Sequence, residues 1–294
     1  MKFILRSILI LIAFSFNVMG QYNSDYMQYM FNGLLINPAY AGSSEALNIS
    51  GMYRNQWMGL PGAPVTAILS AHSPLKNKKV NIGGILINDR FGVFNHTKAS
   101  LIYAYRFKLF NGHLSFGLQA GIDSYTTDWN KINTTDVGDP NFQGQKTRNI
   151  IPEVGAGTFY HSKNFYLGFS IPNLFNTGFN YDMVGILNSG CIIKMSDNIR
   201  LKPAVLIKYL KSSPLSANVS TTFYYKEVFG IGLGYTYKTA TLAYVDLKLN
   251  TQFHLGYGYT YSLNILQNYT SGSHEIMLRY IFQYKINAVS ARYF

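Results

Sequence analysis

The sequence has few charged residues, a single cysteine and no long apolar run beyond its N-terminal region. Charged residues make up 13% of the chain, whereas a soluble globular domain carries roughly 25%. Cys191 cannot form an internal disulfide, and no metal-ligand spacing surrounds it. No later stretch approaches the ~18 apolar residues of a transmembrane helix. These shortages argue against a soluble enzyme, a disulfide scaffold and a helical membrane protein.

Motifs that carry chemistry are missing as well. The chain contains no Gly-x-Ser-x-Gly elbow, no His-Glu-x-x-His, no phosphate-binding glycine loop and no cysteine pair. His274 stands beside Glu275, but adjacent strand residues face opposite sides, so the two are poorly placed to act as an acid–base couple. We therefore expect no catalytic residue, no cofactor and no metal. The six histidines are scattered without ligand spacing: His72, His96, His113, His161, His254 and His274.

Residues 1–20 have the layout of a secretory signal peptide. Lys2 and Arg6 precede an apolar run over 8–16, and the segment ends in Val18-Met19-Gly20, with Val and Gly at the cleavage positions. The run is shorter than the about 20 residues that cross a bilayer as a helix, which disfavours an uncleaved anchor. We expect residues 1–20 to be removed from an exported chain.

Aromatic residues and glycine are abundant, with 24 Tyr, 20 Phe and 26 Gly. Mean hydropathy is nevertheless only +0.02, because apolar residues alternate with polar ones. Over 98–109 the odd positions are apolar, and the even positions are mostly small or charged. The pattern resumes over 113–126 after Asn111-Gly112, a strong hairpin signal. A face rich in Tyr and Phe opposite one rich in Gly, Ser and Thr suits a lipid-facing wall around a polar lumen.

These runs predict an all-β fold, a transmembrane antiparallel β-barrel of about fourteen strands. The mostly alternating short and long connections favour two periplasmic termini in the cell outer membrane, with longer loops outside. The net charge of +12 then suits outer-membrane lipid or an acidic protein better than nucleic acid. The expected strands lie near 46–54, 64–73, 80–88, 98–109, 113–126, 151–161, 165–171, 183–195, 200–211, 216–226, 229–238, 241–249, 252–262 and 274–286.

Residues 21–45 do not alternate, and we expect them to form a unit separate from the barrel of residues 46–294. The segment is rich in Tyr, Met and Leu, which is unusual for a solvated tail. A ring of this width would otherwise hold water, so the segment is expected to plug the lumen. The alternative is a flexible periplasmic segment.

Five separated blocks occur along the chain, namely Asn37-Pro38-Ala39-Tyr40-Ala41-Gly42, Tyr53-Arg54-Asn55-Gln56-Trp57, Gly62-Ala63-Pro64-Val65-Thr66, Asn88-Asp89-Arg90-Phe91-Gly92 and Gly272-Ser273-His274-Glu275-Ile276. Together they resemble the PorP/SprF family, outer-membrane proteins of the type IX secretion system. The similarity runs from about residue 21 to residue 284 with the blocks in the expected order. The resemblance implies a non-enzymatic barrel that acts in adhesin secretion, surface attachment and, in some members, gliding motility.

Strand alternation suggests structural roles for these blocks. Tyr53 and Trp57 are expected as girdle aromatics at the membrane interface. Arg54 and Gln56 then face inward, where the charge of Arg54 needs a partner. Glu275 on the last strand fits, because the first and last strands are neighbours in a closed barrel. We expect this pair to be structural and not catalytic.

The longest expected loop, Thr127 to Ile150, is a candidate surface for a protein partner. Aromatic anchors among charges of both signs suit protein recognition. The leading hypothesis is a barrel that binds a secreted adhesin-like protein through its C-terminal domain, together with other type IX secretion components. A transport barrel for small solutes or hydrophobic compounds is the alternative, and a hydrolase is disfavoured. The loop carries Trp129, Asp136, Asp139, Phe142, Lys146 and Arg148.

Overall fold

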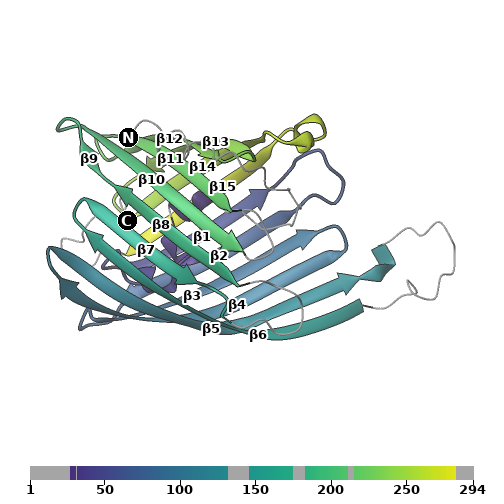
Figure 1. Cartoon of the computed structure of the whole chain (residues 1–294), viewed down its shortest axis with the longest axis horizontal. Helices are drawn as coiled ribbons and strands as arrows, with labels where there is room; N and C mark the ends of the chain where they lie inside the picture. Colours follow the sequence, from purple (N-terminus) through teal and green to yellow (C-terminus); the bar gives the residue numbers. More distant parts are fainter. Residues whose placement is uncertain (1–26, 31, 132–145, 175–182, 211–214, 283–294) are drawn as a thin grey trace, which may run out of the picture.

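The protein forms a closed antiparallel barrel (Figure 1). The computed structural model describes residues 27–30, 32–131, 146–174, 183–210 and 215–282. Its strands are β1 (Leu47–Asn55), β2 (Val65–Pro74), β3 (Val80–Phe91), β4 (Phe94–Leu109), β5 (Gly112–Asp128), β6 (Lys146–Ser162), β7 (Phe165–Ile171), β8 (Val184–Cys191), β9 (Ile193–Lys194), β10 (Ile199–Leu210), β11 (Ser216–Tyr225), β12 (Phe229–Thr236), β13 (Ala240–Lys248), β14 (Phe253–Ser262) and β15 (Ser273–Phe282).

The ring closes through antiparallel pairing of β1 with β15. Sequential neighbours pair around the rest of the wall, and β10 joins β8 to β11. In the described part of the chain fourteen strands make the ring, while the two-residue β9 prolongs β8 along β10. The predicted all-β barrel of about fourteen strands is therefore confirmed.

Three predicted boundaries were wrong. The strand expected over 183–195 is interrupted because the Ile192 N–H donates to the carbonyl of Asn164 in the β6–β7 turn, at 2.8 Å. β4 and β6 begin earlier than expected, so the connection between β3 and β4 is only residues 92–93. Lys146 and Arg148 lie on β6, because β5 and β6 stay paired as far as Asp128 and Lys146. Backbone pairing there continues past the end of the apolar alternation.

Side chains alternate in exposure along the strands, as the barrel requires. On β5, Leu118 is 58% exposed and the following Gln119 is 5% exposed. Large apolar side chains such as Leu101 and Tyr103 cover the outer surface, while polar and charged ones are buried inside. The pattern gives one apolar wall for lipid and one polar wall for the lumen.

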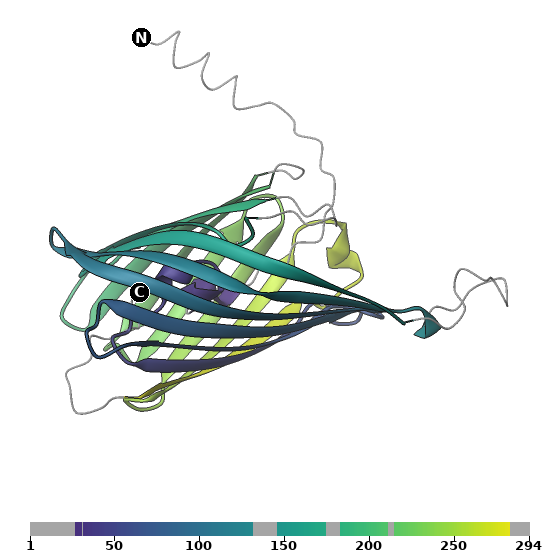
Figure 2. The ribbon, with the colours of Figure 1, turned by 90° about the horizontal axis from the view of Figure 1, so that it is seen from below.

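The connections differ in length between the two ends of the barrel. At one end, called here the short-turn end, they are residues 75–79, 110–111, 163–164, 195–198, 226–228 and 249–252. At the other, called the loop end, they are residues 56–64, 92–93, 129–145, 172–183, 211–215, 237–239 and 263–272. The β5–β6 hairpin extends beyond the rest of the wall at the loop end (Figures 1 and 2).

Short 3₁₀ helices complete the described structure. Three lie inside the barrel (Figure 2), namely η1 (Met27–Met30), η2 (Gly33–Leu35) and η3 (Pro38–Tyr40). Two lie in loop-end connections, η4 (Trp129–Lys131) and η6 (Ile265–Asn268). Among the described residues no helix is long and apolar enough to cross a membrane.

The alternation on β5 gives a direct test of which side faces lipid. Leu118→Arg should reduce the yield of folded barrel sharply, because an arginine on the lipid face near the midplane costs roughly 2–4 kcal/mol. Gln119→Arg places the same side chain in the lumen beside Glu153 and should be tolerated far better. Heat-modifiable gel mobility measures the folded fraction. Equal damage from both substitutions would contradict the assigned faces.

Candidate functional site

The N-terminal segment packs inside the barrel as part of the main hydrophobic core. Leu34, Ala39 and Tyr40 are buried in one cluster with side chains from the barrel wall. Hydrogen bonds also hold the segment against the barrel wall, and the Tyr29 hydroxyl donates to Asn218 Oδ1 at 2.6 Å. The Asn32 amide donates to Ser70 Oγ at 2.8 Å. The described part of this segment therefore packs inside the lumen. Residues 1–26 and 31 lie outside the described residues.

Three inward-facing glycines form a socket for the start of η3. Gly117 on β5 lies directly opposite Gly157 on β6, and Gly168 is on β7. A Cβ at Gly117 would lie 2.2 Å from the backbone nitrogen of Ala39, and one at Gly157 would lie 2.2 Å from Asn37 Oδ1. In the socket the Asn37 amide donates to the carbonyl of Thr158 at 2.9 Å. Any larger residue on this part of the wall would displace the segment.

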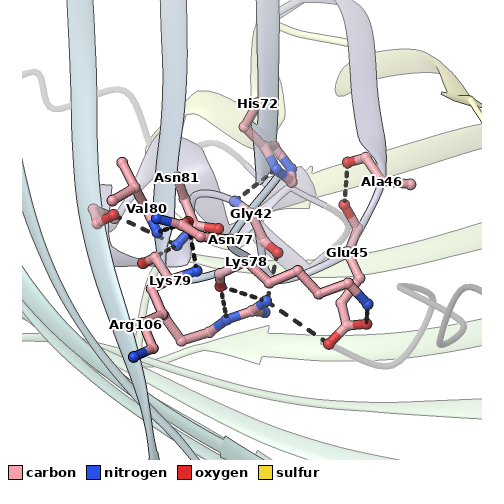
Figure 3. A network of polar contacts seen from close by, with 12 residues as sticks. Gly42, Glu45, Ala46, His72, Asn77, Lys78, Lys79, Val80, Asn81 and Arg106 are labelled. Atoms are coloured by element: carbon pink, nitrogen blue, oxygen red, sulfur yellow. Dashed lines mark hydrogen bonds and ion pairs between the residues drawn. The ribbon is translucent and has the colours of Figure 1, made fainter. Parts of the chain in front are cut away.

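Arg106 on β4 holds the segment where it leaves the lumen for β1 (Figure 3). Its guanidinium donates to the carbonyl of Gly42 at 3.2 Å and, through Nε and Nη2, to the carbonyl of Lys78 in the β2–β3 turn. Glu45 lies 3.7 Å from the same group and also binds Lys78 Nζ at 3.3 Å. One buried cation therefore ties the N-terminal segment to the short-turn end.

Gly42 allows this connection to turn tightly. Its φ of +73° favours glycine, and a Cβ there would lie 2.0 Å from Asn81 Oδ1. The Gly42 N–H donates to His72 Nδ1 at 3.0 Å (Figure 3). The segment is thus bonded to β2 as well as to β4, so its path is constrained from two sides.

The remaining family-like blocks converge at the loop end of β15, β1, β2 and β3. Arg54 pairs with Glu275 across the β1–β15 seam, with Nε 3.8 Å from Oε2, and both side chains are buried. On the next strands Thr66 donates to Asp89 Oδ1 at 2.8 Å. Four separate blocks, the first and last of them more than 200 residues apart, therefore form one continuous, lumen-facing polar row.

A second polar network lies on the inner face of the long strands β4, β5 and β6. Glu153 on β6 accepts hydrogen bonds from Lys98, from Ser100 at 3.0 Å and from Gln119 at 2.7 Å. Gln119 also donates to the carbonyl of Pro172, so the chain leaving β7 rests on the inner wall. This cluster was not predicted from the sequence. The charged residues at inward positions were visible there, but which of them meet is decided by strand register.

The individual block residues take the positions that alternation predicts, with one exception. Tyr53 points outward, while Gln56 is buried. Trp57 lies beyond the end of β1 in the 56–64 connection with a φ of +50°, and its N–H donates to Ser273 Oγ at 3.1 Å. Its backbone thus serves to join two connections, a role that the girdle prediction did not include.

His274 and Glu275 lie on opposite sides of the wall, so they do not meet. Glu275 faces Arg54 in the lumen, whereas His274 Nδ1 lies 2.7 Å from the Tyr257 hydroxyl on the outside. Within the described ranges no group of three or more His, Cys, Asp or Glu side chains has the geometry of a metal site.

The candidate partner loop is only partly described. Trp129 begins η4 at the tip of β5, and Lys146 lies 3.5 Å from Asp128 across the hairpin. Arg148 donates to Ser124 Oγ at 3.0 Å. Asp136, Asp139 and Phe142 lie outside the described residues.

The sequence profile described as type IX secretion system membrane protein PorP/SprF matches residues 18–280. The chain belongs to this family. It is therefore an outer-membrane barrel of the type IX secretion system, a setting that implies contact with other components of that system. Comparison with curated proteins found no match.

Solved structures show the same kind of barrel. Omp33 of Acinetobacter baumannii is 5% identical, with 81% of this chain and 98% of that chain covered and a TM-score of 0.52. A FadL homologue of Pseudomonas aeruginosa is 11% identical, with 90% and 96% covered and a TM-score of 0.46. At these identities the likeness to Omp33 shows the fold alone.

The Arg54–Glu275 pair should be a strong determinant of stability. Arg54→Met removes the cation that faces the buried Glu275 and should lower the free energy of unfolding by about 3–5 kcal/mol. Arg54→Met combined with Glu275→Met removes both charges and should recover most of that loss. Urea midpoints of the refolded barrel measure the effect. Additive losses in the double variant would show that the two charges are not coupled.

The glycine socket predicts a channel phenotype. Gly157→Val should displace Asn37 and raise ion conductance in planar bilayers, as should deletion of residues 21–45 with the leader retained. Gly51→Val is the matched control, because nothing lies within 4 Å of a Cβ at that position on β1. A Gly157→Val barrel that inserts normally with unchanged conductance would show that the segment does not seal the lumen.

Proposed function

We propose that this barrel holds one dedicated secreted protein, an adhesin-like product, at the cell surface by binding its C-terminal domain. Family membership supports the setting in type IX secretion. The adhesin-like nature of the partner rests on the family resemblance. The proposed role is binding, and it requires no catalytic residue.

One observation carries the proposal: four of the five family-like blocks gather at the loop end, and the fifth lies inside the lumen that the chain itself fills. Asn37 and Ala39 lie in the glycine socket, and the other four blocks meet around Arg54 and Glu275. Porins keep a water-filled channel, whereas some transport barrels carry a plug, so the filled lumen argues against an open porin. Ordered connections at the loop end above a filled lumen suit a protein-binding barrel better than an open porin.

We infer that the loop end lies outside the cell and that both termini lie in the periplasm. Bacterial barrels have short periplasmic turns and longer extracellular loops, and four of the seven loop-end connections are longer than any at the short-turn end. The extended β5–β6 hairpin, with Trp129 at its tip, would then reach toward a partner at the surface. In the same proposal residues 1–20 are the cleaved leader, residues 21–45 the plug and residues 46–294 the barrel.

Deletion of the gene tests the proposal. A single large secreted protein should disappear from the cell surface, while other secreted proteins stay at wild-type levels, because the barrel serves one partner. Quantitative proteomics of shaved cell surfaces and of culture medium measures both. Restoring the wild-type gene should restore display.

The competing transport function predicts a different outcome. If surface display is intact in the deletion strain and only the uptake of small solutes fails, the barrel is a transporter. Liposome swelling with purified protein gives an independent reading, since a plugged holder should not admit sugars.

A further inference from the structure

Two loop-end connections form a single platform, defined here as residues 56–64 and 263–272. Met58 joins them, because its N–H donates to the carbonyl of Gly272 at 2.8 Å and its carbonyl accepts from the Ser271 N–H at 2.9 Å. The hydroxyls of Thr270 and Ser271 donate to the same carbonyl at 3.0 and 3.1 Å. The carbonyl of Gly62 also accepts from the Gly92 N–H at 2.8 Å, which ties the platform to the β3–β4 turn.

Local geometry makes the platform rigid. Gly272 has a φ of +97°, and a Cβ there would lie 2.6 Å from the ring of Tyr259, so only glycine fits. Asn264 caps η6, with its side chain accepting from the Leu266 N–H at 3.1 Å. Because backbone bonds hold both connections, their side chains are presented in a fixed arrangement.

The exposed side of the platform combines large apolar side chains with neutral polar ones and carries no charge. Ile265 is 72% exposed and Tyr269 is 64% exposed, and Met58 and Leu263 are exposed beside them. Although the chain has 25 Lys and Arg residues, none occurs in residues 55–64 or 262–273, and neither range contains Asp or Glu. The polar residues present are neutral, such as Asn264, Gln267 and Asn268.

This chemistry favours a protein over phosphate-bearing lipid headgroups. Phosphate-bearing headgroups are bound by lysine and arginine, and the platform has neither. Protein interfaces instead combine an apolar core depleted of charge with a rim of neutral hydrogen-bonding groups. Exposed apolar patches mark sites of association with a protein or a membrane, and the exposed amide side chains of η6 would be costly to bury among acyl chains.

We propose that the two-loop platform binds an uncharged, apolar patch on the C-terminal domain of the secreted partner. The inference rests on the proposed function, since it names the surface by which that partner is held. Ile265 and Tyr269 are the central contacts, and the amide side chains of η6 form the rim. The platform sits on the seam between the first and last strands, so a bound partner would contact only a correctly closed barrel.

The double variant Ile265→Asp with Tyr269→Asp tests the platform. Expressed as a full chain in the deletion strain, it should lower surface display of the protein identified by the deletion experiment by about tenfold or more. Phe110→Asp is the control, because Phe110 is even more exposed but lies in the β4–β5 turn at the opposite end. Both barrels should show wild-type heat-modifiable mobility. A photoreactive amino acid at position 265, and not at position 110, should crosslink to the same protein in whole cells.

The outcomes separate the two proposals. If the deletion strain displays all secreted proteins normally, the proposed function is wrong. If the deletion loses the protein but the double variant displays it at wild-type levels, only the platform is wrong. A membrane role is tested with Ile265→Cys in a Cys191→Ser background, labelled with a fluorophore in phosphatidylcholine vesicles that contain brominated acyl chains. Unchanged fluorescence is expected, and strong quenching would assign the platform to lipid and overturn the inference.

Discussion

Closure of the sheet between β1 and β15 is the constraint on which the rest of the molecule depends. Backbone N–H and C=O groups that face hydrocarbon must be paired within the protein, and a sheet satisfies this only when it has no free edge. Pairing Leu47 with Phe282 and Asn55 with His274 aligns the first strand with the last over its whole length. That alignment brings Arg54 to Glu275, and it brings the 56–64 connection to 263–272.

The width of the ring creates a second requirement, because fourteen strands enclose more space than their own inward side chains fill. The N-terminal segment occupies this space, and the inner face of the wall is complementary to it in shape. Gly117 and Gly157 have no side chains where η3 packs against the wall, and Arg106 donates a hydrogen bond to the segment where it leaves the lumen. Filling and wall are complementary, so the segment belongs to the core and stabilises the ring from within.

The wall is uneven in height, and this shapes the end proposed to face a partner. β5 and β6 have 17 residues each, whereas β7 has 7 and β12 has 8. The tall hairpin therefore stands on one side of the loop end, and the low apolar platform around η6 lies on the other (Figure 1). The polar row from Glu275 to Asp89 and the Glu153 cluster brace the lumen between them. A protein held at this end would have a rigid support on one side and a projecting hairpin on the other.

The sequence by itself determined the class of fold and the face on which each strand residue lies. These are local properties with a period of two, so Leu118 and Gln119 could be assigned to opposite sides without knowing their neighbours. The Arg54–Glu275 pair also followed, because closure makes the first and last strands adjacent. Only the tertiary structure decided which glycines face η3, that Glu153 gathers Lys98, Ser100 and Gln119, and that Met58 joins two connections. These contacts depend on register and on the path of the N-terminal segment, which arise from many small pairing and packing energies summed over the whole ring. No local pattern in the sequence encodes that sum.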